Sequence, residues 1–330
     1  MVSIGYTIMG EQAGPTQLVA DAVRAEEVGF DFLAASDHYS PWLVEQGHAP
    51  YTWAVLGAVA QATESVELMT YVTCPTMRYH PAVVAQKAAT VQLLSEGRFT
   101  LGLGAGENLN EHVAVDGWPP ADIRHRMLRE ALEIIQPLLA GETVTYRGRY
   151  LSTEAARLWD RPEQAPLIGL AVSGAQSAKL AGKLADAMIA VEPDAKLGRK
   201  FAKAGGEGKP RIGQVAVSYD TDAALARSRA LEQFRWFTGG WNVMAELPGP
   251  AHFDAAAALV REEDVAEQIP CGPDTEAHVA AVRRFVDAGF THVALVQVGG
   301  EHQDRFLDWA QAELLPELRS RDRDAPRLAG

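Results

Sequence analysis

The feature that most constrains the fold is a regular alternation of short apolar runs with longer amphipathic stretches. The apolar runs are rich in Val, Ile, Leu and Phe, and most are bounded by Gly, Asp or Pro, as is typical of buried parallel strands. The stretches between them carry apolar residues at three- and four-residue spacing, which predicts helices. The expected strands are 3–8, 30–36, 66–73, 99–104, 167–173, 187–191, 212–218 and 292–298. The expected helices are 15–28, 51–62, 81–94, 123–139, 176–184, 196–203, 223–236 and 275–287, with a closing helix over 305–318.

Eight such alternations favour a closed (β/α)8 TIM barrel of the α/β class over an open doubly wound sheet. After strand four, the alternation of strands and helices is interrupted by two segments, 108–121 and 143–166. The second of these contains a predicted hairpin around 146–150. Segment 237–271 is a further insertion before the last helix–strand pair. We find no internal boundary, so residues 1–330 are predicted to form one domain, with a charged and frayed tail over 319–330.

Composition narrows the classes of function. The net charge of −13 argues against nonspecific binding to nucleic acid or to an anionic membrane surface. Two cysteines, Cys74 and Cys271, imply no disulfide framework, and no apolar run is long enough to span a bilayer. We therefore expect a cytoplasmic protein with a small-molecule substrate.

The active site of such a barrel lies at the carboxyl ends of the strands, and this rule selects Asp37 and His38 after strand two. A histidine there is suited to accept or hold a proton when an alcohol carbon loses hydride. A structural histidine hydrogen-bonded beneath a loop is the alternative, and the rim position favours the catalytic interpretation. Trp42, in the following loop, could form a wall for a flat ligand or could serve only loop packing.

Strand four ends in glycines at positions 102, 104 and 106, followed by Glu107. These glycines would let the backbone approach a planar ligand closely. They half match a dinucleotide-binding fingerprint, but the third glycine spacing is missing and residues 107–110 do not resemble a clean helix start. We therefore give the dinucleotide interpretation little weight.

Ser173 and Gly174 precede a predicted helix, and the free N–H groups of its first turn predict a phosphate cradle. An ordinary serine cap is an equally good interpretation. The sequence has no Gly-Lys-Ser/Thr P-loop, His-Glu-x-x-His or Gly-x-Ser-x-Gly motif, and no Cys/His spacing suited to zinc, so we predict no metal site.

Three motifs together are specific: SDHYSPW at 36–42, PTMRYHPAV at 75–83 and GLGAGENLNE at 102–111. With them the chain resembles the F420-dependent branch of the luciferase-like superfamily, closest to the F420-dependent glucose-6-phosphate dehydrogenases. The resemblance runs from Ile4 to the closing helix. It implies coenzyme F420 as the cofactor, a homodimer, and hydride transfer from a hydroxyl or hemiacetal carbon to C5 of the deazaflavin, with the reverse direction also open.

The resemblance also assigns residues. His38, Trp42 and Glu107 occupy the catalytic positions, and one of His38 and Glu107 takes the hydroxyl proton while the other stabilises charge or protonates N1 of the ring. A non-proline cis peptide is expected at Tyr71-Val72, behind the ring. The remaining implied cofactor contacts are Asp37 at the headgroup, Ala105, Gly106 and Asn110 along the cofactor, and Ser173, Gly174 and Ala175 at its phosphate.

One departure bears on the substrate. Members of the branch hold the sugar phosphate with two lysines and an arginine, and the corresponding positions here are Asp194, Met244 and Gln268. An acid, a thioether and an amide cannot replace three cations, although Lys196, Arg199 or Lys200 could substitute. We expect glucose 6-phosphate to be a poor substrate. Two rival hypotheses are an FMN-dependent monooxygenase on the same barrel and a non-catalytic deazaflavin-binding protein.

Overall fold

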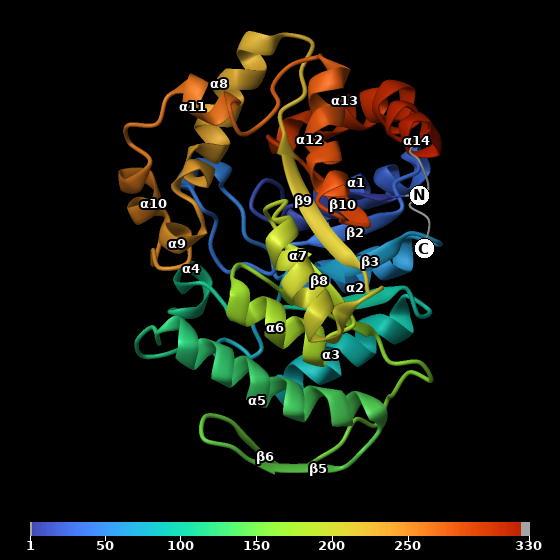
Figure 1. The fold of residues 1–330 in the computed structure, drawn as a ribbon, viewed down its shortest axis with the longest axis vertical. Helices are drawn as coiled ribbons and strands as arrows, with labels where there is room; N and C mark the ends of the chain where they lie inside the picture. Colours follow the sequence, from blue (N-terminus) through green and yellow to red (C-terminus); the bar gives the residue numbers. More distant parts are fainter. Residues whose placement is uncertain (1, 325–330) are drawn as a thin grey trace.

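A closed barrel of eight parallel strands forms the centre of the protein (Figure 1). The structure is a computed structural model that describes residues 2–324, with side chains through residue 320. The strands are β1 (Ser3–Ile8), β2 (Phe32–Ala35), β3 (Glu67–Thr70), β4 (Phe99–Leu103), β7 (Leu167–Ala171), β8 (Ala187–Ala190), β9 (Arg211–Val217) and β10 (His292–Gln297). Their order is β1-β10-β9-β8-β7-β4-β3-β2, and pairing of β1 with both β10 and β2 closes the ring. The predicted barrel is confirmed.

Helices cover the outside of the barrel (Figure 1). They are α1 (Pro15–Val28), α2 (Thr52–Ala62), α3 (Pro81–Leu94), α5 (Ala121–Ala140), α6 (Ala175–Leu184), α7 (Ala195–Phe201), α8 (Ala223–Phe234) and α12 (Thr275–Asp287). α7 and α8 are shorter than predicted, because a π turn, η2 (Ala202–Gly206), follows α7 and a 3-10 turn, η3 (Arg235–Gly239), follows α8. The closing helix is likewise divided into α13 (Gln303–Trp309), a π turn, η5 (Ala310–Leu314), and α14 (Leu315–Asp324).

Packing inside the barrel explains why position 102, on β4, is a glycine. The interior is filled by large side chains, among them Phe32, Met69 and Ile189. A Cβ on Gly102 would lie 1.9 Å from the carbonyl oxygen of Thr70, so no larger residue fits on β4 at this point. Gly102 therefore serves close strand packing and belongs to the fold rather than to a ligand-binding loop.

The insertion after β4 and α5 contains the predicted hairpin. β5 (Val144–Arg147) pairs antiparallel with β6 (Ser152–Ala156). The Glu130 carboxylate on α5 accepts hydrogen bonds from the backbone N–H groups of Arg149, Tyr150 and Leu151, which fixes the turn against the helix. One prediction in this region is wrong: a short helix, α4 (Asn108–Glu111), begins directly after Glu107.

The insertion 237–271, called the second insertion below, folds into small helices beside α8. These are α9 (Trp241–Met244), α10 (Pro250–Ala256) and α11 (Glu262–Ala266). They bury Phe253, Val265 and Ile269 in an aromatic cluster that also contains Trp42 and Trp236. This insertion therefore reaches the loop that follows β2.

Helix α14 continues through Asp324, so residues 319–324 of the predicted frayed tail are helical. Arg319 donates to the carbonyl oxygen of Gly29 and holds this helix against the end of α1. The rest of that predicted tail, 325–330, lies outside the described residues. Within the described part of the chain, no helix combines the length and apolar character needed to cross a bilayer.

Candidate active site

A cavity of about 310 Å³ opens at the carboxyl ends of the barrel strands. All eight strands or the loops after them contribute to its lining, which is the arrangement that this fold uses for catalysis. The contributors include Thr7 and Met9, Asp37 and His38, Tyr71 and Val72, Gly104 to Glu107, Ser173, Val191, Ala216 and Val296.

His38 lies between two carboxylates at the centre of this rim. Its Nδ1 contacts the carboxylate of Glu11, and its Nε2 lies 2.8 Å from Glu107 Oε1. Burial disfavours the charged imidazole, but the charges of Glu11 and Glu107 outweigh it and raise the pKa of His38 well above its ordinary value. Burial also acts to raise the pKa of Glu11, yet the charge of His38 leaves that pKa below its ordinary value. His38 is therefore an imidazolium held between two buried anions.

Asn110 fixes the position of Glu107. Its Nδ2 donates to Glu107 Oε1 at 2.7 Å, while its Oδ1 accepts from the backbone N–H groups of Tyr39 and Ser40. The single turn of α4 makes this possible, since it brings residue 110 back over residue 107. Asn110 is buried and joins the loops after β2 and β4.

Asp37 lines the cavity, but its carboxylate is held by the protein. Oδ2 accepts from Trp53 Nε1 at 3.0 Å and from Thr73 Oγ1 at 2.7 Å. Oδ1 lies 3.3 Å from both the Arg78 guanidinium and the Tyr79 hydroxyl. Four donors on a buried carboxylate make Asp37 a support for the loop after β3, a function that its place in the sequence does not reveal.

The ends of β3 and β4 contribute a glycine-containing part of the cavity lining. The peptide bond Tyr71-Val72 is cis, as the family resemblance implies. A Cβ on Gly104 would lie 2.7 Å from Val72 Cγ2, and one on Gly106, whose φ is +82°, would lie 2.8 Å from Cys74 Sγ. Side chains at 104 or 106 would therefore alter this surface, while glycine leaves the backbone open to a planar ligand.

The loop after β7 leads directly into α6 at the cavity rim. Ser173 lines the cavity, whereas Gly174 and Ala175 follow it and lie outside the lining. Ser177 Oγ accepts from the N–H groups of Ser173 and Gly174, so the side chain that satisfies this turn is Ser177 and not Ser173. The first-turn N–H groups of α6 keep the character of an anion site.

Trp42 is buried against the second insertion. Its ring stacks on Trp236 with centroids 4.1 Å apart and meets Phe253 and His38 edge-on. Sequence patterns missed Trp236, because it reads as the end of a helix. They also missed Glu11, although it follows β1 at the same rim and the strand-end rule could have found it.

The three positions aligned with a phosphate clamp do not come together. Met244 lines the cavity, but Asp194 and Gln268 are not among the lining residues. Asp194 caps α7 by accepting from the N–H groups of Lys196 and Leu197, and Gln268 is exposed beyond α11.

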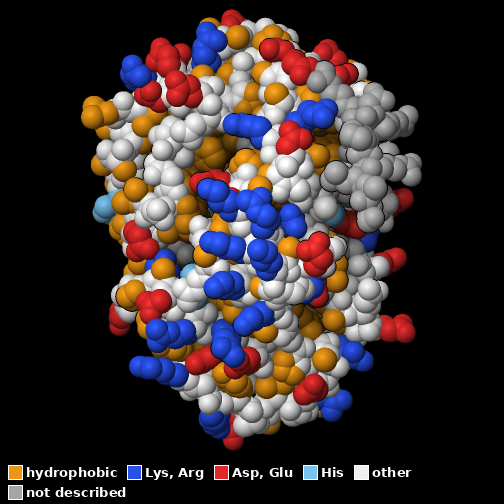
Figure 2. All heavy atoms as spheres, viewed as in Figure 1, with side chains coloured by type: hydrophobic (Ala, Val, Ile, Leu, Met, Phe, Trp, Pro, Cys, Tyr) orange, Lys and Arg blue, Asp and Glu red, His pale blue; other side chains and the backbone are white. Residues whose placement is uncertain are grey.

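The basic residues that could have substituted for the clamp lie on the outer surface. Figure 2 shows Lys and Arg side chains gathered over the region of α6 and α7. Lys196, Arg199 and Lys200 are exposed there, and none of them lines the cavity.

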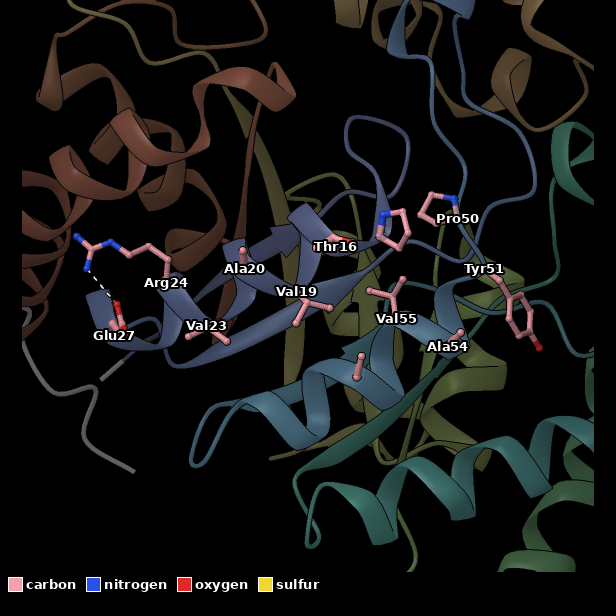
Figure 3. Close-up of a pocket in the computed structure, with 12 residues that line it drawn as sticks. Thr16, Val19, Ala20, Val23, Arg24, Glu27, Pro50, Tyr51, Ala54 and Val55 are labelled. Carbon is pink, nitrogen blue, oxygen red and sulfur yellow. Dashed lines mark hydrogen bonds and ion pairs between the residues drawn. The ribbon is translucent and has the colours of Figure 1, made fainter.

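A second hollow, of about 1000 Å³, lies between α1 and α2 (Figure 3). Its lining is mainly apolar, with Val19, Val23 and Val55 among its residues. The charged pair Arg24 and Glu27 are bonded to each other at its edge. No acid–base constellation faces this hollow among the described residues, so the candidate site is the cavity at the strand ends. The described residues also contain no cluster of three or more potential metal ligands.

Comparison with known proteins agrees with this geometry. The family described as luciferase-like monooxygenase matches residues 2–292. The chain is 37% identical to the F420-dependent glucose-6-phosphate dehydrogenase of Amycolatopsis mediterranei (strain U-32), over 97% of this chain and 99% of the relative. It is also 37% identical to the F420-dependent hydroxymycolic acid dehydrogenase of Mycobacterium tuberculosis (strain ATCC 25618 / H37Rv), over 96% of this chain and 88% of the relative. An F420-dependent secondary alcohol dehydrogenase, solved with an F420-acetone adduct, superposes with a TM-score of 0.87 at 29% identity, covering 96% of this chain and 99% of that structure.

Proposed function

This chain belongs to the luciferase-like monooxygenase family, and we propose that within it the protein is a coenzyme F420-dependent dehydrogenase acting on a hydroxyl carbon. The observation that carries the proposal is the buried His38, held between Glu11 and Glu107 beside a glycine-lined surface. Relatives named as F420-dependent dehydrogenases match nearly the whole chain, which supports the same cofactor and reaction type here.

The residues of the cavity fit a deazaflavin. The Tyr71-Val72 bond, Ala105 and Gly106 would support the ring, because all of these residues line the cavity. Ser173, Gly174 and Ala175, at the start of α6, would lie at the phosphate of the cofactor, with the first-turn N–H groups that Ser177 does not occupy as its donors. When bound, F420 supplies the acceptor for the hydride.

Oxidation of an alcohol breaks its C–H bond, with both electrons leaving as hydride, and its O–H bond, whose proton goes to a base. Both ring nitrogens of His38 are engaged by carboxylates, Nδ1 by Glu11 and Nε2 by Glu107, so neither nitrogen is open to accept the proton. Glu107 is the better base, because Oε1 is occupied by His38 and Asn110 while Oε2 makes no hydrogen bond or ion pair with a described residue. The His38 cation then stabilises the negative charge that develops on the substrate oxygen.

The test is the isosteric variant Glu107→Gln, which retains an oxygen for Asn110 but cannot accept the proton. We expect kcat to fall by about 10² to 10⁴, the usual contribution of a general base, with F420 affinity within about threefold of the parent. Glu163→Gln, on the exposed loop before β7, is the matched control for loss of one carboxylate. Unchanged kcat in Glu107→Gln would overturn this assignment.

Oxygen dependence separates the proposal from an FMN monooxygenase, and binding without turnover would point to a non-catalytic protein. A homodimer, a single structural domain and a cytoplasmic location are further parts of the proposal. The apolar hollow between α1 and α2 supports pairing, since a second copy could cover it. Sedimentation equilibrium of the full chain tests the homodimer.

A further inference from the structure

This inference rests on the proposed dehydrogenase function. We infer that the substrate is an uncharged alcohol with a bulky apolar body, and that a wall of side chains from the insertion 237–271 selects it. The proposal rests on two independent features of the cavity. One is the balance of charge along its lining, and the other is the origin of its aromatic side chains.

Acidic groups dominate the lining. The carboxylates are Glu11, Asp37, Glu107, Glu111 and Glu246. Arg124 is the lining's sole lysine or arginine within the described part of the chain. His38, the other cation of the lining, is already paired with Glu11 and Glu107, and a phosphate dianion would have to compete with these carboxylates for it.

Arg124 is not available to an anion. Its guanidinium forms an ion pair with Glu246 at 3.1 Å and donates to the carbonyl oxygen of Pro119 at 2.9 Å. The Trp118 ring covers it at 4.0 Å, and the side chain is only 6% exposed. Arg124 thus serves to hold Glu246 at the rim.

The wall is apolar and aromatic. From η3 and α9 the insertion contributes Phe237, Trp241 and Met244, which line the cavity together with Trp42 and Trp236. Met244 is buried in this wall, and its thioether side chain carries no charge. The wall meets uncharged substrate surface, whose removal from water favours binding.

Backbone and side-chain hydrogen bonds fix this wall to the catalytic rim. The Asn108 backbone N–H donates to the carbonyl oxygen of Ala245, and Asn108 Nδ2 donates to that of Glu246, each at 3.0 Å. Because Asn108 directly follows Glu107, the insertion holds a defined place beside the base. Met244, directly before Ala245 in this wall, is therefore a specificity-determining residue.

The experiment compares kcat/KM, with F420 present, for glucose 6-phosphate and for secondary alcohols from 2-propanol to 2-octanol. We expect kcat/KM to rise by about fourfold for each added methylene until the cavity is filled. We expect glucose 6-phosphate to be at least 100-fold poorer than the best alcohol. A preference for glucose 6-phosphate, or no dependence on chain length, would overturn the inference.

Met244→Lys tests the wall, and Val243→Lys is its matched control, since Val243 is exposed on the same helix and does not line the cavity. In Met244→Lys we expect kcat/KM for 2-octanol to fall at least tenfold while F420 affinity stays within threefold, and the control to retain the parent values. Equal losses in both variants would overturn the role of Met244. Failure of the parent to bind F420 would instead remove the proposed function itself, as would binding with no turnover across the panel.

Discussion

Replacing Glu11 by glutamine should strip His38 of half its anionic surroundings without changing the shape of the site. Glu11 contacts His38 Nδ1, and its other oxygen accepts from Ser36 Oγ at 2.8 Å. A glutamine can keep a hydrogen bond to either partner but carries no charge. The substitution therefore isolates the electrostatic effect of Glu11 on the imidazolium.

The size of the effect follows from burial. The Glu11 side chain is 1% exposed and that of His38 is 13% exposed, so an effective dielectric of about 20 is more appropriate than that of water. Two unit charges about 4 Å apart then interact by about 4 kcal/mol. Because one pKa unit corresponds to 1.36 kcal/mol, loss of this interaction in Glu11→Gln should lower the pKa of His38 by about 3.

NMR titration of the labelled imidazole of His38, identified by its loss in His38→Asn, measures this shift directly. The cation persists only below its pKa, so the alkaline limb of the kcat/KM profile should move to lower pH by a similar amount. Glu163→Gln should move neither quantity. A shift below about one unit in Glu11→Gln would refute the picture of His38 as an imidazolium held by two carboxylates.

Other consequences can be measured separately. Burial raises the pKa of Glu111 from 4.5 to about 7. Because the folded state holds this proton more tightly, the free energy of unfolding should fall by about 3 kcal/mol as the pH rises from about 4.5 to about 7. Urea unfolding of Glu111→Gln should lose this pH dependence. Gly106→Ala places a Cβ 2.8 Å from Cys74 Sγ at a backbone φ of +82°. Calorimetry should therefore show that the free energy of unfolding falls by about 1–3 kcal/mol. An unchanged Tm would contradict this. Asn110→Ala frees Glu107 and should lower kcat about tenfold in steady-state assays.

Much of the fold could be predicted from hydrophobic period alone. The expected bounds of β1, α1, α3 and α12 agree with the structure at both ends, because each lies between clear start and stop signals. The short helix α4 could not be predicted, since one turn carries too few residues to show a period. The π and 3-10 turns that follow α7 and α8 depend on tertiary packing in the same way.

The candidate site likewise has features that the sequence could predict and features that it could not. The strand-end rule placed His38 and Glu107 correctly at the cavity, and the resemblance implied the cis bond at Tyr71-Val72. The strand-end rule could also have found Glu11, but only the structure shows that its carboxylate contacts His38 Nδ1. The same holds for Asp37, whose carboxylate is bound by donors from distant parts of the chain.

The central claim is that this cavity binds F420 for hydride transfer from an alcohol, and fluorescence titration tests it most directly. Purified protein is titrated with F420 and, separately, with FMN, and 2-octanol is then added to the F420 complex. We expect F420 to bind at least 100-fold more tightly than FMN, and the alcohol to bleach the absorbance of the oxidised deazaflavin near 420 nm. Tight binding of FMN with no binding of F420 would contradict the account.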